Sequence, residues 1–202
     1  MFLRFCIKKS FIRQGLFLAF IGSVSFNALN ASELKECKSE EDKKVGCIEK
    51  EYYKNGSLES EATFKNGVIE GVGKVYYENG NLRAEIPFKN GKQEGIGKSY
   101  YENGNLEHEA TFKNGVIEGI AKSYYENGNI ASEITFMNGK AHGSVKFYSK
   151  KLIWQANAQN GKLINGKCAN GKTLTNEHLA KIDRDIYKFN INKDSWLEMC
   201  KD

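Results

Sequence analysis

The sequence predicts a mostly β fold: an elongated, twisted antiparallel β-meander of 24-residue hairpin repeats that ends in a small C-terminal helical cap. Asn-Gly, a strong short-range hairpin signal, occurs twice in each repeat. An apolar stripe at helical spacing follows the repeats, after Lys172. The period itself is marked by a Tyr-Tyr pair that returns every 24 residues, at 52–53, 76–77, 100–101 and 124–125.

Residues 1–31 are predicted to be a secretory signal peptide outside the fold. A basic start precedes a mostly apolar stretch, Gly15 to Leu29, and the small residues Ala28 and Ala31 lie near the expected cleavage point. The stretch is too short and too polar for a good membrane span, so an uncleaved anchor is the weaker alternative. We therefore expect export to the periplasm or the extracellular space, with no integral span in the mature chain.

The net charge of the whole chain misrepresents that of the mature chain. The formal charge is +5, from 30 basic and 25 acidic residues. Four basic residues and no acidic one lie in 1–31, which leaves 26 basic and 25 acidic residues, or +1. No basic patch suited to nucleic acid remains, so nucleic-acid binding is not expected.

Four cysteines remain in the mature chain, and an even number in an exported chain predicts disulfides. Three connectivities are open. Because the repeat array separates the two pairs, we expect Cys37–Cys47, within an N-terminal segment 32–47, and Cys168–Cys200. Zinc is the weaker alternative, because these spacings do not give paired short-spaced ligands.

The repeats are expected to span 48–171, with a strand on each side of every Asn-Gly turn. If Asn79-Gly80 is a two-residue type I′ loop, residues 76–77 face residues 82–83, and Lys74 faces Glu85. A lysine opposite a glutamate then recurs in the other repeats, at Lys50–Glu61, Lys98–Glu109 and Lys122–Glu133. Such pairs set register and solubility.

Strand alternation separates two faces of the predicted sheet. One is apolar and is expected to be partly exposed as a groove; its phenylalanines are Phe64, Phe88, Phe112 and Phe136. The other carries the charged pairs and a tyrosine stripe, Tyr52, Tyr76, Tyr100 and Tyr124. These tyrosines are either packing on a solvated face or a recognition stripe for a protein partner, since rigid aromatics give contact area at low entropic cost.

We expect no enzyme, cofactor or metal site. The sequence lacks a nucleophile elbow and a phosphate-binding Walker loop. His108-Glu109 begins like a zinc-protease motif, but Phe112 stands where its second histidine would fall. Gly95 and Gly97 lack the third glycine of a dinucleotide fingerprint and instead permit a turn, bulge or close backbone approach.

Residues 172–202 are predicted to cap the array. Thr175 or Asn176 can begin a helix. Asp194 can start a short second turn that carries Trp196, Leu197 and Met199. The helix's apolar stripe consists of Leu179, Ile182, Ile186 and Phe189. This stripe is either core, as a repeat array needs at its end, or a partner site.

The repeats resemble the MORN-repeat-variant family, in the version described as the antitoxin component of bacterial toxin–antitoxin modules. The Tyr-Tyr-Glu-Asn-Gly block, the Phe-Lys-Asn-Gly block and the closing Glu-Gly carry this resemblance over about 48–148, with a worn copy to about 171. The resemblance implies a repeat-type module that binds and neutralises a partner protein. Eukaryotic MORN proteins add membrane and scaffold roles.

Two hypotheses of function follow from these patterns. In the first, an exported, immunity-like module binds a partner protein along its sheet. In the second, a structural cell-envelope component self-associates through its sheet edges or its apolar groove.

Export predicts a mature N-terminus near Ser32, because the small residues that precede it suit signal peptidase. Intact-mass measurement of the protein purified from its native host tests this prediction. A full-length chain in the cytosol would contradict it.

Overall fold

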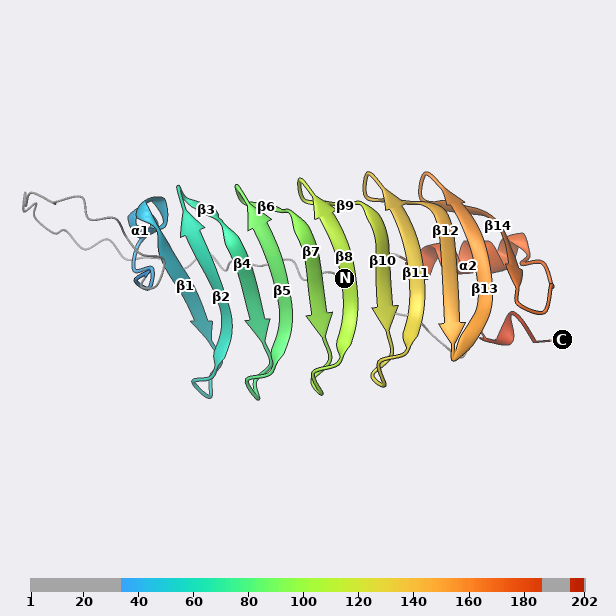
Figure 1. Ribbon diagram of the computed structural model, residues 1–202, viewed down its shortest axis with the longest axis horizontal. Coiled ribbons are helices and arrows are strands. Elements are labelled where there is room, and N and C mark those ends of the chain that lie inside the picture. The colour runs from blue at the N-terminus through green and yellow to red at the C-terminus, as the bar shows by residue number, and fades with distance from the viewer. Residues whose placement is uncertain (1–33, 187–196, 202) are drawn as a thin grey trace, which may run out of the picture. The chain divides into compact units, whose positions relative to one another are not determined.

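The computed structural model describes residues 34–186 and 197–201, which belong to one compact unit, Leu34–Asp202. This unit is built on a single antiparallel sheet whose strands follow one another in chain order (Figure 1). The main path is β1-β2-β4-β5-β7-β8-β10-β11-β12-β13-β14, and the short strands β3, β6 and β9 pair with β2, β5 and β8. The predicted meander is confirmed.

The elements have these bounds. The strands are β1 (Cys47–Tyr52), β2 (Leu58–Lys65), β3 (Val68–Ile69), β4 (Gly71–Tyr76), β5 (Leu82–Lys89), β6 (Lys92–Gln93), β7 (Gly95–Tyr100), β8 (Leu106–Lys113), β9 (Val116–Ile117), β10 (Gly119–Tyr124), β11 (Ile130–Met137), β12 (Lys140–Ser149), β13 (Lys151–Gln159) and β14 (Lys162–Cys168). The helices are α1 (Glu40–Val45) and α2 (Asn176–Ile186).

The second Asn-Gly of each repeat forms the predicted type I′ turn. In β5–β6, Lys89 pairs with Lys92, and Asn90 and Gly91 have φ values of 51° and 74°. Positive φ at both central positions is the property of this turn, and asparagine and glycine tolerate it. The worn copy keeps the same geometry at Asn160, with φ of 51°.

The first Asn-Gly of each repeat forms a different turn, so the predicted two-residue loop is wrong there. Gly80 N donates to the Tyr77 carbonyl (2.9 Å), Tyr77 N donates to the Asn81 carbonyl (2.8 Å), and only Gly80 of the Asn-Gly pair has a positive φ, 88°. This is a type I turn followed by a glycine bulge. It pairs Tyr76 with Leu82, which corrects the predicted pairing of residues 76–77 with 82–83.

The lysine–glutamate register is confirmed in the body of each hairpin, where Lys74 faces Glu85. The ion pairs, however, cross to the other neighbouring strand. Lys74 Nζ lies 3.6 Å from Glu61 Oε1 on β2, and Lys98 lies 3.8 Å from Glu85. Lys74, Lys98 and Lys122 each have a glutamate on both sides, and each contacts the glutamate of the preceding repeat.

Most of the apolar face is buried, although Phe88 is only half-buried, which corrects the expectation of an exposed apolar groove. Phe64, Phe112 and Phe136 are each at most 4% exposed, and Ile86 is 2% exposed. The Phe112 ring fits closely over Gly97, because a Cβ there would come within 3.1 Å of that ring. We refer to this side of the sheet as the core face.

The N-terminal end of the sheet is closed by α1 and by the predicted Cys37–Cys47 disulfide, which is confirmed. Ser39 caps α1 by accepting from Asp42 N. In later repeats the turn glycine donates to the preceding repeat, as Gly91 N does to the Ile69 carbonyl (2.9 Å). Gly67 N donates instead to the Lys43 carbonyl (3.0 Å), so α1 takes the place of a missing repeat.

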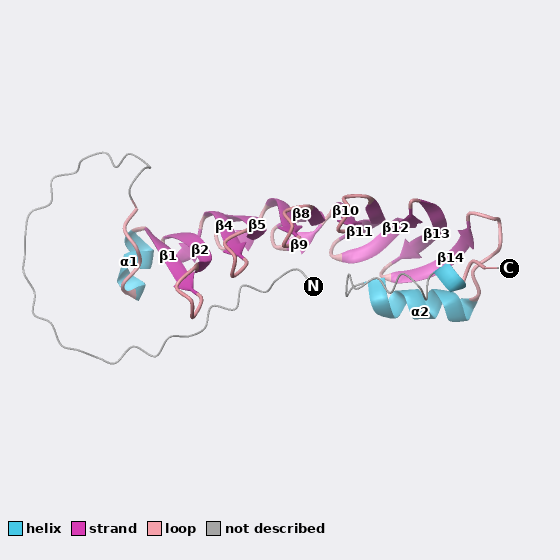
Figure 2. Cartoon of the chain, turned by 90° about the horizontal axis from the view of Figure 1, so that it is seen from below, coloured by secondary structure: helices cyan, strands magenta, loops and turns pink. Residues whose placement is uncertain are grey.

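The C-terminal cap is confirmed where the structure describes it. Figure 2 shows α2 against the sheet beside its last strands. Thr175 caps the helix through its hydroxyl, which accepts from His178 N (3.2 Å). The predicted stripe members Leu179, Ile182 and Ile186 are buried, and the Cys168–Cys200 disulfide is present. The remaining predictions, Phe189, Asp194 and Trp196, lie outside the described residues.

We predict that Gly80→Val destabilises the protein by about 1–3 kcal/mol, because a β-branched residue is strained at positive φ. No atom lies within 4 Å of a Cβ added there, so the loss reports backbone strain rather than a clash. Urea denaturation measures it.

The matched control is Gly80→Asn, which we expect to cost much less, because asparagine tolerates this region. Equal losses for valine and asparagine would contradict the observed turn.

Candidate functional site

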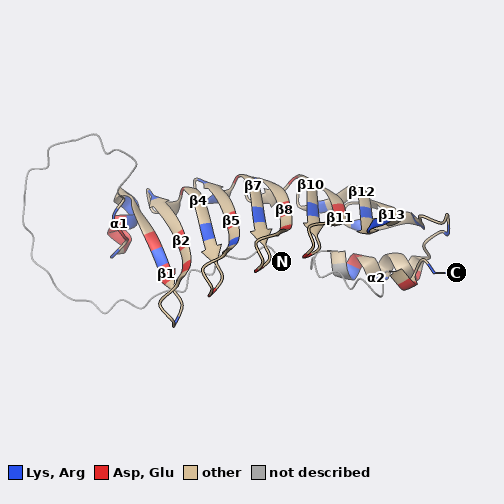
Figure 3. Ribbon diagram, turned by 60° about the horizontal axis from the view of Figure 1, so that its bottom comes forward, with Lys and Arg blue, Asp and Glu red and all other residues tan. Residues whose placement is uncertain are grey.

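The side of the sheet opposite the core face, which we call the ladder face, carries a row of alternating charges. In Figure 3 the basic residues appear as blue segments of the ribbon on β4, β7 and β10. The row consists of Lys50, Glu61, Lys74, Glu85, Lys98, Glu109, Lys122, Glu133 and Lys146. Neighbouring strands therefore present opposite charges, and the row is close to neutral overall.

The first tyrosine of three Tyr-Tyr pairs, and the equivalent Tyr148 on β12, pack onto this row. Tyr76 Oη donates to Glu61 Oε1 (2.8 Å), the carboxylate that also contacts Lys74. The arrangement repeats along the sheet, at Tyr100–Glu85 (2.7 Å), Tyr124–Glu109 (2.8 Å) and Tyr148–Glu133 (2.8 Å). Each glutamate is thus held between a lysine and a phenol, with its side chain fixed in position.

These contacts change the acidity of the phenols. Burial, followed by the hydrogen bond to Glu61, raises the pKa of Tyr76 to about 12. The same causes, with Glu85 as partner, raise the pKa of Tyr100 to about 12. A phenolate beside a carboxylate would place two negative charges together, so the neutral phenol is favoured.

The second tyrosine of each pair joins neighbouring repeats through the backbone. Tyr77 Oη donates to the Tyr100 carbonyl (2.7 Å), 23 residues ahead. Equivalent bonds are Tyr53 to Tyr76 (2.6 Å), Tyr101 to Tyr124 (2.7 Å) and Tyr125 to Tyr148 (2.6 Å). These hydroxyls act within the fold and fix the spacing of one hairpin to the next.

A row of exposed aliphatic side chains runs beside the charges. Val72 is 49% exposed, Ile96 is 56% exposed and Ile120 is 54% exposed. Val72 lies two residues before Lys74 in β4, so alternation puts it on the ladder face. We call these three residues the aliphatic row.

Between them stand smaller side chains on the paired strands. Val72 pairs with Pro87, and Ile96 pairs with Thr111. Members one repeat apart are separated by two strand spacings, about 10 Å. The ladder face therefore offers one projecting aliphatic group per repeat at regular intervals.

The structure places the predicted tyrosine stripe, Tyr52, Tyr76, Tyr100 and Tyr124, along the ladder face. Tyr52 is 50% exposed, whereas the other three tyrosines are less exposed than Tyr52. Their role in binding a partner stays a prediction. Our sequence analysis did not single out the aliphatic row. Its signal was available, because valine or isoleucine follows the closing Glu-Gly in three repeats.

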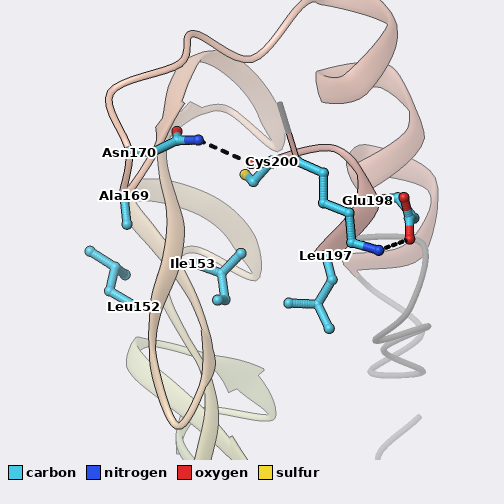
Figure 4. Close-up of a pocket in the computed structure, with 8 residues that line it drawn as sticks. Leu152, Ile153, Ala169, Asn170, Leu197, Glu198 and Cys200 are labelled. Carbon is cyan, nitrogen blue, oxygen red and sulfur yellow. Dashed lines mark hydrogen bonds and ion pairs between the residues drawn. The ribbon is translucent and has the colours of Figure 1, made fainter.

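A separate pocket lies near Cys200 in the C-terminal cap (Figure 4). It has a volume of about 460 Å³ and an apolar wall that includes Leu152, Ile153 and Leu197. Its polar groups bind one another, since Asn170 Nδ2 donates to the Cys200 carbonyl (3.1 Å) and Lys201 pairs with Glu198. This pocket does not bring together groups suited to catalysis.

His108, which begins the incomplete zinc-protease motif, contacts neighbouring side chains within the sheet. His108 Nδ1 lies 3.1 Å from Ser99 Oγ and 3.5 Å from Glu107, and the imidazole is mostly buried. Over residues 34–186 and 197–201, no three metal-ligating side chains gather into a metal site. Among the same residues, no helix has the length and apolarity to cross a membrane.

The fold thus places this chain in the class of open β-hairpin repeat proteins. The family model described as MORN repeat variant matches four segments of this chain, residues 48–66, 69–90, 93–114 and 117–138. These matches support the MORN-repeat resemblance across the repeated part of the sheet. No curated protein matches the chain.

Two solved structures show limited similarity. The Glycosylation Associate Protein (Gap123) complex from Streptococcus agalactiae has a TM-score of 0.32 at 17% identity, over 52% of this chain and 19% of that chain. Accessory secretory protein 1, 2 and 3 in Streptococcus pneumoniae has a TM-score of 0.24 at 13% identity, over 72% of this chain and 25% of that chain. This chain therefore spans a quarter or less of either protein.

We predict that the array loses stability in alkaline solution. The ordinary tyrosine pKa is 10.0, and in the fold it is about 12 for Tyr76, Tyr100 and Tyr124. Folding therefore favours the neutral phenols. Their contribution is complete below pH 10 and is lost as pH rises from 10 to about 12. Urea denaturation at a series of pH values measures the loss.

The matched control is Tyr100→Phe, which removes one ionising group and should make the alkaline loss shallower. A profile that is flat from pH 10 to 12, or that this substitution leaves unchanged, would contradict the prediction.

Proposed function

We propose that this chain is an exported repeat-type module that binds a protein partner along its ladder face. The observation that carries this proposal is the aliphatic row, three large apolar side chains about half exposed at equivalent positions of successive repeats. The core face, in contrast, is buried. Aligned, exposed apolar groups typically mark an interaction site.

The charges beside the row suit a protein surface. Alternating lysines and glutamates can pair with opposite charges at a polar rim, while the aliphatic groups supply the desolvated centre. Because the glutamates are already held by tyrosines and lysines, they lose little side-chain entropy on binding. Several similar contacts, one from each repeat, would then add up along the sheet.

Two features support the proposal that the chain is exported. The charged and apolar pattern of residues 1–31, which lie outside the described residues, is that of a signal peptide. The two disulfides fit an oxidising compartment, since cytosolic thiols are normally kept reduced.

The family resemblance adds a finer proposal: that binding neutralises the partner, as an antitoxin or immunity protein does. A catalytic role is not part of the proposal. Self-association of a structural envelope component is the alternative function.

Both edges of the sheet carry contacts that weigh against edge-to-edge self-association. Ile48 on β1 exchanges backbone hydrogen bonds with Lys35 and Cys37. On β14, Leu163 N donates to Asp183 of α2 (2.9 Å), and Gly166 accepts from Leu174 N (2.9 Å). The ladder face is thus the better surface for a partner.

We predict that Ile96→Ser combined with Ile120→Ser weakens partner binding by more than about tenfold, because each isoleucine loses an apolar contact area. Both side chains are more than half exposed, so the fold should remain intact. The experiment is affinity capture from native envelope extract, followed by a binding constant for the captured partner.

The matched control is Ile164→Ser, because Ile164 is 54% exposed on β14, away from the row. Equal binding by the wild type and the double variant would contradict the proposal. Light scattering tests the alternative: oligomers that form with rising concentration, without a partner, would favour self-association.

A further inference from the structure

A second site lies at the end of the row of turns that begin with the second tyrosine of each repeat. In this row each turn binds the next one. Asn81 Nδ2 donates to the Glu102 carbonyl (2.8 Å), and Asn105 Nδ2 donates to the Glu126 carbonyl (2.6 Å). The asparagine two residues earlier also takes part, since Asn79 Nδ2 donates to Glu102 Oε1 (3.0 Å). Each of the first three turns therefore donates a side-chain hydrogen bond to the glutamate carbonyl of the turn that follows.

The row is interrupted after the fourth turn, and a turn with the same hydrogen bonds returns only at residues 168–172. Residues 125–129 connect Tyr124 to Ile130, whereas only 149–151 connect Tyr148 to Leu152. The shorter connection lacks the Asn-Gly of the earlier ones. The sheet continues through β12 and β13, but the place of a fifth turn is not filled by this chain.

A groove of about 420 Å³ lies where the fifth turn would be expected. Its lining residues include Tyr101, Tyr125, Glu126, Asn127, Asn129 and Lys150. Asn127 and Asn129 are the equivalents of the asparagines that bind the next turn in the preceding repeats. Both are exposed, and among the described residues the structure gives their amide nitrogens no acceptor.

We infer that this groove is a binding site for a protein loop, which would occupy the place of the missing turn. The two carboxamides would donate to a backbone carbonyl of that loop, as Asn81 and Asn105 do within the chain. The Lys150 ammonium would meet an acidic side chain of the same loop, in the position that Glu102 takes beside Asn79. Tyr125 supplies an aromatic wall.

The charges of the groove favour a loop over a small anion. Glu126 lines the same groove as Lys150, so the two opposite charges leave it near neutral. A bare anion gains little there, whereas a turn with a neutral carbonyl and one carboxylate matches both the amides and the lysine. This site is separate from the ladder face, and a loop can bind it whether or not the ladder face binds a partner.

The probe is a cyclic peptide that reproduces residues 76–82 of this chain, Tyr-Tyr-Glu-Asn-Gly-Asn-Leu, because cyclisation preforms the turn. We expect it to shift the side-chain amide NMR signals of Asn127 and Asn129 in the full mature protein. A scrambled cyclic peptide of the same composition should leave both signals in place.

The double variant Asn127→Asp with Asn129→Ala removes both donors. Aspartate keeps the oxygen that accepts from the backbone N of residue 129 (3.0 Å), so the turn remains formed. Peptide binding should weaken by about tenfold. The control Asn81→Ala deletes an amide that the chain itself already uses, and should leave peptide affinity unchanged.

Unshifted amide signals in the wild type would overturn the inference. Equal peptide affinity of the wild type and the double variant would overturn it as well.

Discussion

The hydrogen bond from the second tyrosine of each repeat to the backbone of the next is the interaction on which the rest of the sheet depends. A lone hairpin cannot bury its apolar face, so a repeat array gains its stability from contacts between neighbours. Tyr77 Oη reaches the Tyr100 carbonyl and thereby fixes where the next hairpin begins. Once that spacing is fixed, Glu61 meets Lys74 and Tyr76, and Phe112 packs over Gly97.

The first and last repeats of such an array each lack one neighbour and need a capping element. This protein caps its two ends differently. At the start, the carbonyls of α1 accept from the first type I′ turn, as a preceding repeat would. At the other end, α2 packs on the last strands and binds β14 through Asp183. A disulfide joins each end to the sheet. Only the turn row is left without a closing partner, and the groove beside Asn127 is the result.

Much of the fold could be predicted, because period, strand alternation and cysteine number are local properties of the sequence. The failures have local causes too. Asn-Gly suits both a type I′ turn and a type I turn with a glycine bulge; Asn81, whose N–H binds the Asn79 side chain, favours the second. The predicted register paired Lys74 with Glu85 in the same hairpin, whereas the ion pair to Glu61 depends on the neighbouring hairpin, which that register did not include. Recognising the aliphatic row required knowing that most of the opposite face is buried, which alternation alone does not establish.

The direct test is the stability of Tyr77→Phe and Tyr101→Phe, which remove only the hydroxyls that join one repeat to the next. Each should lower the free energy of unfolding by about 1 kcal/mol. The loss should be larger where no water molecule reaches the backbone carbonyl that has lost its phenol donor. Tyr52→Phe is the matched control, because Tyr52 is half exposed and should change stability by less than about 0.5 kcal/mol. Equal stability of all three variants in urea denaturation would contradict the central role of these hydrogen bonds.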